Sequence, residues 1–337
     1  MKRILLESHN YSLTGAPLVL LQLAKGLKGE YETIMWSPFS GPLELELEQA
    51  DLKWYALGSP ESLGEYMKHP WAKPDLVIAN TLLSWPVVLE ARSKGIPCLW
   101  WLHEGARARQ ALMSQGLQEA LALHSEYVVS SRYLAELYKG QGYVHEIPYG
   151  VPVTPAKEWG NPGDRPLEFL VAGTIEWRKG QDRVLEAWSR VKPQGARLTL
   201  LGDASNGWAK SLRGEYSHLS GVTWLDPMSP SKFSESLGNY DILLVPSRDE
   251  GGYPQVLLQA QEKGLCVVAW DCCGMKEQVR PGTGYIKNSI ESLGEMISNI
   301  TPEQASQVGK QARRWAHFNN SLETHIQDWK SLIEEVI

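Results

Sequence analysis

Two cationic side chains, Arg178 and Lys179, lie in a turn between an apolar run and a predicted helix that begins near Gln181. A lysine point charge and the positive end of a helix dipole both attract an anion, so this turn suits a diphosphate. A solvated basic turn has the same sequence, and it is the better interpretation of an isolated Arg-Lys-Gly. The other polar turns of the chain must therefore show whether this turn binds a diphosphate or is an ordinary solvated turn.

A second polar turn lies in the stretch SRDEGGYPQVLLQAQEKG, Ser247 to Gly264. The strand-like run DILLVPS leads into acidic and glycine residues, and a helix is predicted from Pro254. Glycines let backbone N–H groups approach a ligand closely, and the start of a helix favours an anion. From this stretch alone, an ordinary strand-to-helix turn is an equal alternative.

A third turn combines Thr14, Gly15 and Ala16 with Pro17 at a predicted helix start, where the missing N–H of proline costs nothing. The turn has neither the G-x-G-x-x-G of dinucleotide-binding proteins nor the G-K-[ST] of a P-loop. It indicates a helix start that could accept a phosphate and is a weak observation by itself.

Short apolar runs alternate with helix-length segments along the whole chain. In the first half the runs cover residues 3–9, 31–37, 53–57, 75–80, 98–104, 127–131 and 144–148. Near-continuous apolar strands that alternate with helices are typical of parallel sheets covered on both faces. Ligands bind such sheets at the carboxyl ends of the strands, where the three polar turns lie.

The alternation restarts after a segment rich in proline and glycine. We therefore predict an α/β protein of two Rossmann-like domains, the first over 1–150 and the second over 167–301, joined by a linker at 151–166. Residues 302–337 look wholly helical, and we expect these helices to pack back on the N-terminal domain.

Composition and charge argue against several classes of function. The chain has 337 residues, 43% of them hydrophobic, and a formal net charge of -6. No basic run follows a phosphate backbone, so nucleic acid is not an expected partner. No window reaches the roughly 18 apolar residues of a spanning helix, which predicts a cytoplasmic protein with at most weak peripheral membrane contact. The four cysteines lack zinc spacing, and no metal site is expected.

Several motifs in order resemble glycosyltransferase family 4, retaining nucleotide-sugar enzymes of the GT-B fold. The C-terminal half contributes VAGTIEWRKGQDRVLEAW, LTLLGD and the stretch from DILLVPS to CVVAWDCCG, and the N-terminal half contributes SLTGAP, WWLHE, VVSSRYLAELY and IPYGV. The resemblance covers nearly the whole chain. It implies two domains with their sheets facing a central cleft, and sugar transfer from a nucleotide diphosphate to a glycan, lipid-linked or small-molecule acceptor. It also implies no metal and no cofactor.

The resemblance also implies roles for individual residues. Lys179, helped by Arg178, would hold the diphosphate, and Gly15 would offer its backbone N–H to the same phosphates from across the cleft. His103 would contact the donor sugar or the leaving phosphate. With Glu250, the catalytic set is His103, Lys179 and Glu250. The donor-binding set is Gly15, Thr174, Arg178, Lys179, Gly251, Gly252, Tyr253 and Gln259.

The family's pair of glutamates is altered in this chain. Gln259 stands where the second glutamate belongs and Gly251 where the first belongs, with Glu250 one residue early. Either an extra glycine lets Glu250 take the usual place, or Asp249 and Glu250 have another task. Thr174 also replaces an arginine that many members have.

Other functions fit the same two-domain pattern. A nucleotide-sugar epimerase or hydrolase is one alternative, and a non-catalytic nucleotide-sugar-binding module, which would explain the altered glutamates, is another. An oxidoreductase is disfavoured because neither half has the glycine fingerprint. The sequence does not identify the acceptor.

Overall fold

The structure, a computed structural model, describes residues 1–56, 73–159 and 165–337. The described chain forms two compact units, Met1–Gly150 with Leu322–Ile337, and Val151–Ser321. Residue 57, at the end of an expected strand, and residues 160–164 of the expected linker lie outside the described residues.

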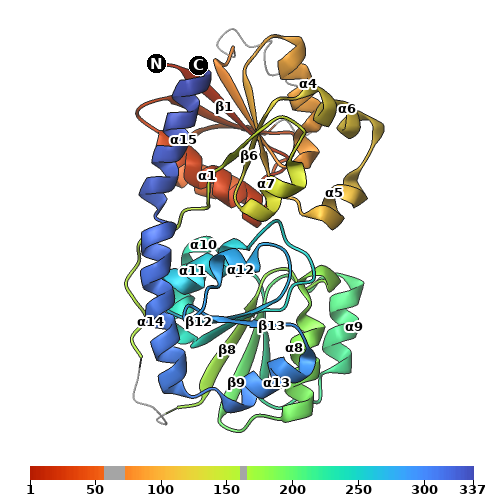
Figure 1. The fold of residues 1–337 in the computed structure, drawn as a ribbon, viewed down its shortest axis with the longest axis vertical. Coiled ribbons are helices and arrows are strands. Elements are labelled where there is room, and N and C mark those ends of the chain that lie inside the picture. Colours follow the sequence, from red (N-terminus) through yellow and green to blue (C-terminus); the bar gives the residue numbers. More distant parts are fainter. Residues whose placement is uncertain (57–72, 160–164) are drawn as a thin grey trace. The chain divides into compact units, whose positions relative to one another are not determined.

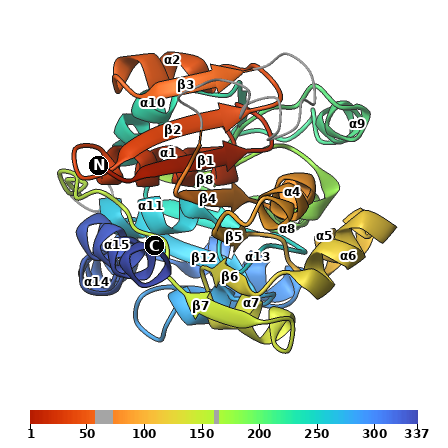
Figure 2. The ribbon, with the colours of Figure 1, turned by 90° about the horizontal axis from the view of Figure 1, so that it is seen from above.

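The first unit (Figure 1) is built on a parallel sheet in the order β3-β2-β1-β4-β5-β6-β7, and Figure 2 labels each of these strands. Strands β4 and β5 are buried at every position, as expected for central strands that carry helices on both faces. The strands are β1 Arg3–Ser8, β2 Glu32–Ser37, β3 Lys53–Ala56, β4 Leu76–Asn80, β5 Cys98–Leu102, β6 Glu126–Val129 and β7 Tyr143–Glu146.

Helices cover both faces of this sheet (Figure 2). On one face α1 packs on β1 and β2 and against α15, burying Leu20, Leu23, Ala24 and Leu27 at the three-to-four-residue spacing of a helix stripe. On the other face α4 packs on β4 and β5 and against α6. The helices are α1 Gly15–Leu27, α2 Leu43–Gln49, α4 Trp85–Ser93, α5 Ala106–Leu112, α6 Gln115–Leu123, α7 Arg132–Tyr138 and α15 Leu322–Val336.

The second unit contains a parallel sheet in the order β10-β9-β8-β11-β12-β13. Its strands are β8 Leu167–Ala172, β9 Ala196–Leu201, β10 Val222–Leu225, β11 Ile242–Val245, β12 Cys266–Trp270 and β13 Tyr285–Lys287. Its helices are α8 Gln181–Val191, α9 Gly207–Glu215, α10 Pro230–Ser236, α11 Gln255–Lys263, α12 Met275–Gln278, α13 Ile290–Asn299 and α14 Pro302–Asn319. The expectation of two Rossmann-like domains with parallel sheets is confirmed.

The C-terminal helices are divided between the units. Helix α14 packs on α11 and β12 in the second unit, whereas α15 packs on α1 in the first. The sequence predicted that the helices of residues 302–337 pack on the N-terminal domain. This is wrong for α14, and only α15 belongs to the first unit. The break follows Asn319, where Asn320 takes a non-helical conformation and Ser321 pairs with Val151.

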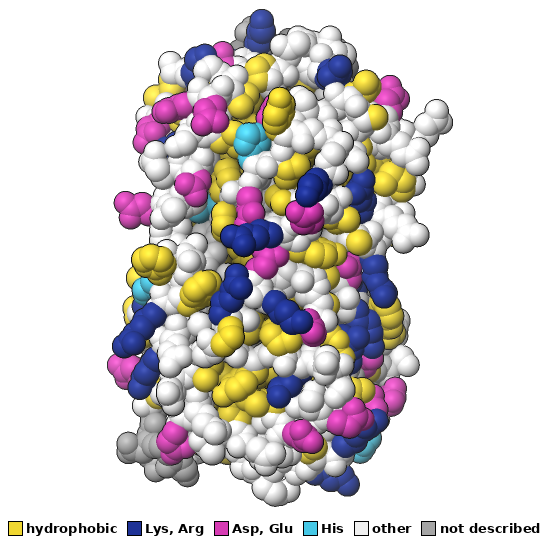
Figure 3. Space-filling view, in the orientation of Figure 1, with side chains coloured by type: hydrophobic (Ala, Val, Ile, Leu, Met, Phe, Trp, Pro, Cys, Tyr) yellow, Lys and Arg dark blue, Asp and Glu magenta, His cyan; other side chains and the backbone are white. Residues whose placement is uncertain are grey.

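Two features concern the molecular surface. Acidic and basic side chains are interspersed on the face drawn in Figure 3. None of the described helices combines the length and apolar character needed to span a bilayer.

Candidate functional site

The turn that carries Lys179 is held against the end of a neighbouring strand. Residues Trp177–Lys179 form a short 3-10 helix between β8 and α8, and Gly180 closes it with a φ of 71°. A side chain at Gly180 would place a Cβ 2.2 Å from the carbonyl oxygen of Pro246, just after β11. Only glycine combines this backbone angle with so close an approach. The turn after β8 and the turn after β11 therefore lie together.

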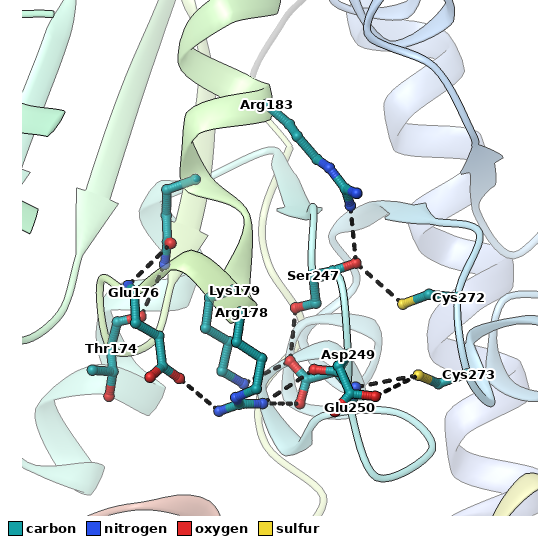
Figure 4. A network of polar contacts seen from close by, with 11 residues as sticks. Thr174, Glu176, Arg178, Lys179, Arg183, Ser247, Asp249, Glu250, Cys272 and Cys273 are labelled. Carbon is teal, nitrogen blue, oxygen red and sulfur yellow. Dashed lines mark hydrogen bonds and ion pairs between the residues drawn. The ribbon is translucent and has the colours of Figure 1, made fainter. Parts of the chain in front are cut away.

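Three of the predicted site residues meet at this place (Figure 4). Lys179 Nζ lies 2.6 Å from Oε1 of Glu250, and Arg178 Nη1 lies 3.3 Å from its Oε2. Arg178 also donates to the backbone oxygen of Asp249 at 3.1 Å and pairs with Glu176 at 2.7 Å. The two cations thus converge on one carboxylate at the carboxyl ends of neighbouring strands, which is where ligands bind in sheets of this type.

Glu250 is a buried anion held in place from several sides. Its side chain is 7% exposed, and Oε1 also accepts from the Ser247 hydroxyl at 2.7 Å. Burial favours the neutral acid, but Lys179 and Arg178 outweigh it and leave the pKa of Glu250 below its usual value. The carboxylate is therefore ionised at neutral pH and keeps both cations in the site.

The loop after Glu250 depends on its glycines. Gly252 has a φ of 98°, and its carbonyl oxygen accepts from the N–H of Gly274 at 3.1 Å. A Cβ on Gly274 would lie 2.8 Å from the Cα of Gly252, so the two loops touch through backbone. The run Glu250-Gly251-Gly252 thus turns sharply and leaves the Glu250 side chain beside Lys179.

The adjacent cysteines belong to this loop system and make hydrogen bonds there that sequence reasoning did not predict. Cys273 accepts a hydrogen bond from the backbone N–H of Glu250 at 3.2 Å, and Cys272 donates to the carbonyl oxygen of Ser247 at 3.1 Å. Ser247 was also missed as a partner of the carboxylate. The positions of Ser247, Cys272 and Cys273 in loops after strands could have indicated these contacts, because the loops after parallel strands meet at one edge of the sheet.

The remaining predicted residues of this unit are more dispersed. Thr174 contributes its backbone, whose carbonyl oxygen accepts from Gln181 at 2.9 Å. Tyr253 is buried, and its hydroxyl accepts from the Asn320 amide at 3.4 Å. Gln259 lies on α11, one turn beyond the helix start, and is half-buried. The Lys179–Glu250 cluster therefore contains part of the predicted set.

Two further predicted residues, Gly15 and His103, are linked within the first unit. Gly15 is the exposed first residue of α1, and Thr14 before it makes no side-chain cap to the helix. His103 follows β5, and its Nε2 lies 2.5 Å from Asn80 Oδ1, whose Nδ2 donates to the carbonyl oxygen of Ala16 at 3.0 Å. Nδ1 of the same ring lies 2.6 Å from the Tyr149 hydroxyl. Sequence reasoning missed Asn80 and Tyr149.

Three titratable groups, Glu7, His103 and Glu104, lie at or just after the carboxyl ends of β1 and β5. Burial raises the pKa of Glu7 to about 8 and that of Glu104 to about 7. Burial, with a smaller contribution from His9, lowers the pKa of His103 to about 3. Within the described residues, Oε2 of Glu7 has no hydrogen-bond partner. The carboxyl edge of the first sheet thus contains acids that retain protons at unusually high pH, next to a neutral histidine.

Comparison with known families accounts for both units. Residues 1–138 match the family described as "Glycosyl-transferase family 4", and residues 166–301 match "Glycosyl transferases group 1". The chain belongs to glycosyltransferase family 4. No group of three or more His, Cys, Asp or Glu side chains in the described part of this glycosyltransferase is arranged to hold a metal ion.

Curated relatives match the glycosyltransferase over parts of their length. It is 26% identical over 190 residues to an exopolysaccharide phosphotransferase of Streptomyces coelicolor, which covers 52% of this chain and 20% of that protein. It is 29% identical over 118 residues to the amylovoran biosynthesis glycosyltransferase AmsD of Erwinia amylovora, which covers 35% of this chain and 33% of AmsD. The matches thus span a fifth and a third of these two relatives.

Solved structures match it over nearly the whole chain. Anabaena HepE in complex with UDP-glucose has a TM-score of 0.85 at 18% identity, covering 99% of this chain and 100% of HepE. Sucrose-phosphate synthase of Thermosynechococcus elongatus has a TM-score of 0.79 at 18% identity, covering 99% of each chain. At this identity the likeness concerns the fold, and the expected GT-B fold is confirmed.

Proposed function

We propose that this protein transfers a sugar from a nucleotide-diphosphate donor to a growing glycan, a lipid-linked sugar or a small acceptor. The observation that carries the proposal is the pair of cations, Lys179 and Arg178, gathered on the buried carboxylate of Glu250 at the start of α8. The names of the two curated relatives, in exopolysaccharide and amylovoran synthesis, support a glycan acceptor.

The second unit binds the donor phosphates in this proposal. In sugar transfer, negative charge builds on the leaving diphosphate while the sugar becomes cationic. Lys179 and Arg178 stabilise that charge, and their contacts to Glu250 fix the positions of Nζ and the guanidinium beforehand. Glu250 stays anchored by Ser247 and keeps its contacts to both cations while they reach the phosphates, and its Oε2 faces the donor sugar.

The other predicted residues complete the donor site. The backbone of the loop Gly251-Gly252-Tyr253 and that of Thr174 line it, and Gln259 binds the ribose as a neutral substitute for a glutamate. From the first unit, Gly15 offers its N–H to the phosphates, and His103 approaches the sugar or leaving phosphate. A ring contact from His103 requires one of its two present hydrogen bonds to open.

The transfer proceeds with retention and without a metal ion or resident cofactor. The Glu250 carboxylate is held by Ser247 and by Arg178 and Lys179, and the charge-stabilising groups are the two cations. A front-face substitution assisted by the leaving phosphate therefore fits the side chains better than a double displacement.

A donor screen followed by product analysis tests the proposal. Thermal shifts are measured with UDP-, GDP-, ADP- and dTDP-sugars, beginning with UDP-glucose because HepE was crystallised with it. The preferred donor is then incubated with candidate glycan acceptors, with and without EDTA, and the anomeric configuration of the product is determined by NMR. We expect EDTA-resistant transfer with retention. Donor binding without turnover would favour a non-catalytic module, and nucleotide release that no acceptor increases would favour a hydrolase.

A further inference from the structure

Asn80, the last residue of β4, bridges two segments that are far apart in the sequence. Its Nδ2 lies 3.0 Å from the backbone oxygen of Ala16 in the first turn of α1, and its Oδ1 lies 2.5 Å from Nε2 of His103. A backbone carbonyl oxygen can only accept, so the amide nitrogen must face Ala16 and the amide oxygen must face the histidine. Nε2 of His103 therefore carries the proton.

The second ring nitrogen completes the chain of hydrogen bonds. Nδ1 of His103 lies 2.6 Å from the hydroxyl of Tyr149. Burial lowers the pKa of His103 to about 3, so the ring is neutral at physiological pH and has one proton. With that proton on Nε2, Nδ1 accepts and Tyr149 donates. His103 is thus held as a single tautomer with both ring nitrogens in use.

The hydrogen bonds that join Tyr149, His103, Asn80 and Ala16 form a relay, and its Tyr149 end lies where the chain leaves the first unit. Tyr149 precedes Gly150, the last residue of that unit before the chain enters the second. The adjacent carbonyl of Pro148 accepts from Nδ1 of His325 on α15 at 2.7 Å. The exit segment is therefore fastened at two consecutive residues, one bond leading to His103 and the other to the C-terminal helix.

We propose that Asn80 and Tyr149 are positioning residues, which fix His103 as the Nε2–H tautomer and hold the first turn of α1 for donor binding. The relay runs from Tyr149 through His103 and Asn80 to Ala16, next to Gly15. In the free protein His103 acts in it through its two hydrogen bonds, to Asn80 and to Tyr149. The effect of these two residues on phosphate binding rests on the proposed function, which assigns Gly15 to the phosphates. The tautomer of His103 does not depend on the proposed function.

The tautomer is tested by nitrogen NMR on protein labelled in its histidine rings, with His103 assigned through His103→Gln. At neutral pH we expect a protonated Nε2 and an unprotonated Nδ1. Tyr149→Phe should shift the Nδ1 resonance, and Asn80→Ala should give a mixture of tautomers. A wild-type ring protonated on Nδ1, or on both nitrogens, overturns the relay whether or not the protein transfers sugar.

The positioning role is tested with inorganic pyrophosphate, which probes the phosphate site without committing to a nucleotide. Asn80→Ala and Tyr149→Phe should each raise its Kd by about 3- to 10-fold, the scale of one hydrogen bond. The double variant should lose little more than the weaker-binding single variant, because both changes break one relay. Tyr127→Phe is the matched control, since it removes a buried hydroxyl that donates to the carbonyl oxygen of Leu121 at 2.8 Å.

The outcomes separate the two proposals. Asn80 and Tyr149 variants that lower Tm but keep the wild-type pyrophosphate Kd, as expected for the Tyr127 control, would show a purely structural role and overturn the positioning role. A wild-type protein that binds neither pyrophosphate nor any nucleotide sugar would overturn the proposed function and the phosphate step with it. The NMR assignment would stand in that case.

Discussion

Replacing Lys179 by alanine separates the two tasks that the structure and the proposed function give to this side chain. In the free protein Nζ neutralises the buried carboxylate of Glu250 at 2.6 Å. In the reaction it is proposed to stabilise the charge that builds on the leaving diphosphate. The first task concerns stability and the second concerns rate, so one substitution should change both.

The two magnitudes follow from different interactions. Loss of one charged contact in the transition state costs about 3 kcal/mol, which lowers kcat/KM for the donor by roughly 100-fold or more. In the free protein Arg178 and Ser247 still contact Glu250, so the lost partner should reduce the free energy of unfolding by about 1–3 kcal/mol. The pKa of Glu250 should rise in the variant because Lys179 is the largest of the influences that lower it.

A second substitution distinguishes the effects. Adding Glu250→Gln to Lys179→Ala removes the buried charge that has lost its nearest cation and should restore most of the stability without restoring the rate. Lys276→Ala is the matched control, since it removes an exposed lysine of the same unit that pairs with Asp271. The assays are nucleotide release from the preferred donor and thermal unfolding. A Lys179→Ala protein with wild-type kcat/KM and reduced Tm would show that this lysine serves only as the counter-ion of Glu250, and the phosphate assignment would be wrong.

Four other outcomes are expected. Because the pKa of Glu7 is raised to about 8 in the folded protein, the native state holds a proton that the unfolded chain loses above the ordinary pKa of 4.5. The free energy of unfolding should therefore fall as the pH rises from 4.5 to 8, by at most about 1.4 kcal/mol per pH unit. Glu7→Gln should flatten the slope of Tm against pH. Gln259→Glu should tighten donor binding by about fivefold and Gln259→Ala should weaken it, and unchanged Kd values for both would place this residue outside the ribose site. Glu176→Gln should free Arg178 for the phosphates and lower the donor Kd two- to threefold by calorimetry, or about 0.5 kcal/mol, whereas a higher Kd would mean that the carboxylate orients the guanidinium. Glu262→Ala should lower the free energy of unfolding by about 3 kcal/mol in denaturant titrations, because it removes the buried carboxylate that accepts from Thr154 and neutralises Arg313; a loss under 1 kcal/mol would contradict this.

The sequence was sufficient for the two sheets because their central strands are apolar at nearly every position. Strands β4, β5 and β11 have no polar alternation, which is typical of parallel strands under helices. The division of the C-terminal segment was not predictable in this way. Both α14 and α15 have helical periodicity, and the break at Asn320 is set by pairing of Ser321 with Val151, a contact that no local pattern reveals.

The individual turns of the site were predictable, but their contacts were not. Lys179 and Glu250 are 71 residues apart, and they meet because β8 and β11 are neighbours in the sheet. The apolar runs predict strands and their parallel direction without fixing their order. The sequence therefore identified the two polar turns, while the ion pair between them depends on the order of the strands in the sheet.

The charges around Lys179 indicate how the site could bind phosphates although Thr174 stands where many family members have an arginine. Arg178 supplies a cation a few residues later, but it is paired with Glu176 and Glu250 in the free protein. The two partners differ in how easily they can release it. The carboxylate of Glu176 is 37% exposed and regains water when the pair opens, whereas that of Glu250 is 7% exposed and would lose a neutralising contact within the protein. An incoming diphosphate should therefore displace Glu176 and keep Glu250, so that Arg178 and Lys179 reach the phosphates while the buried carboxylate still fixes their positions.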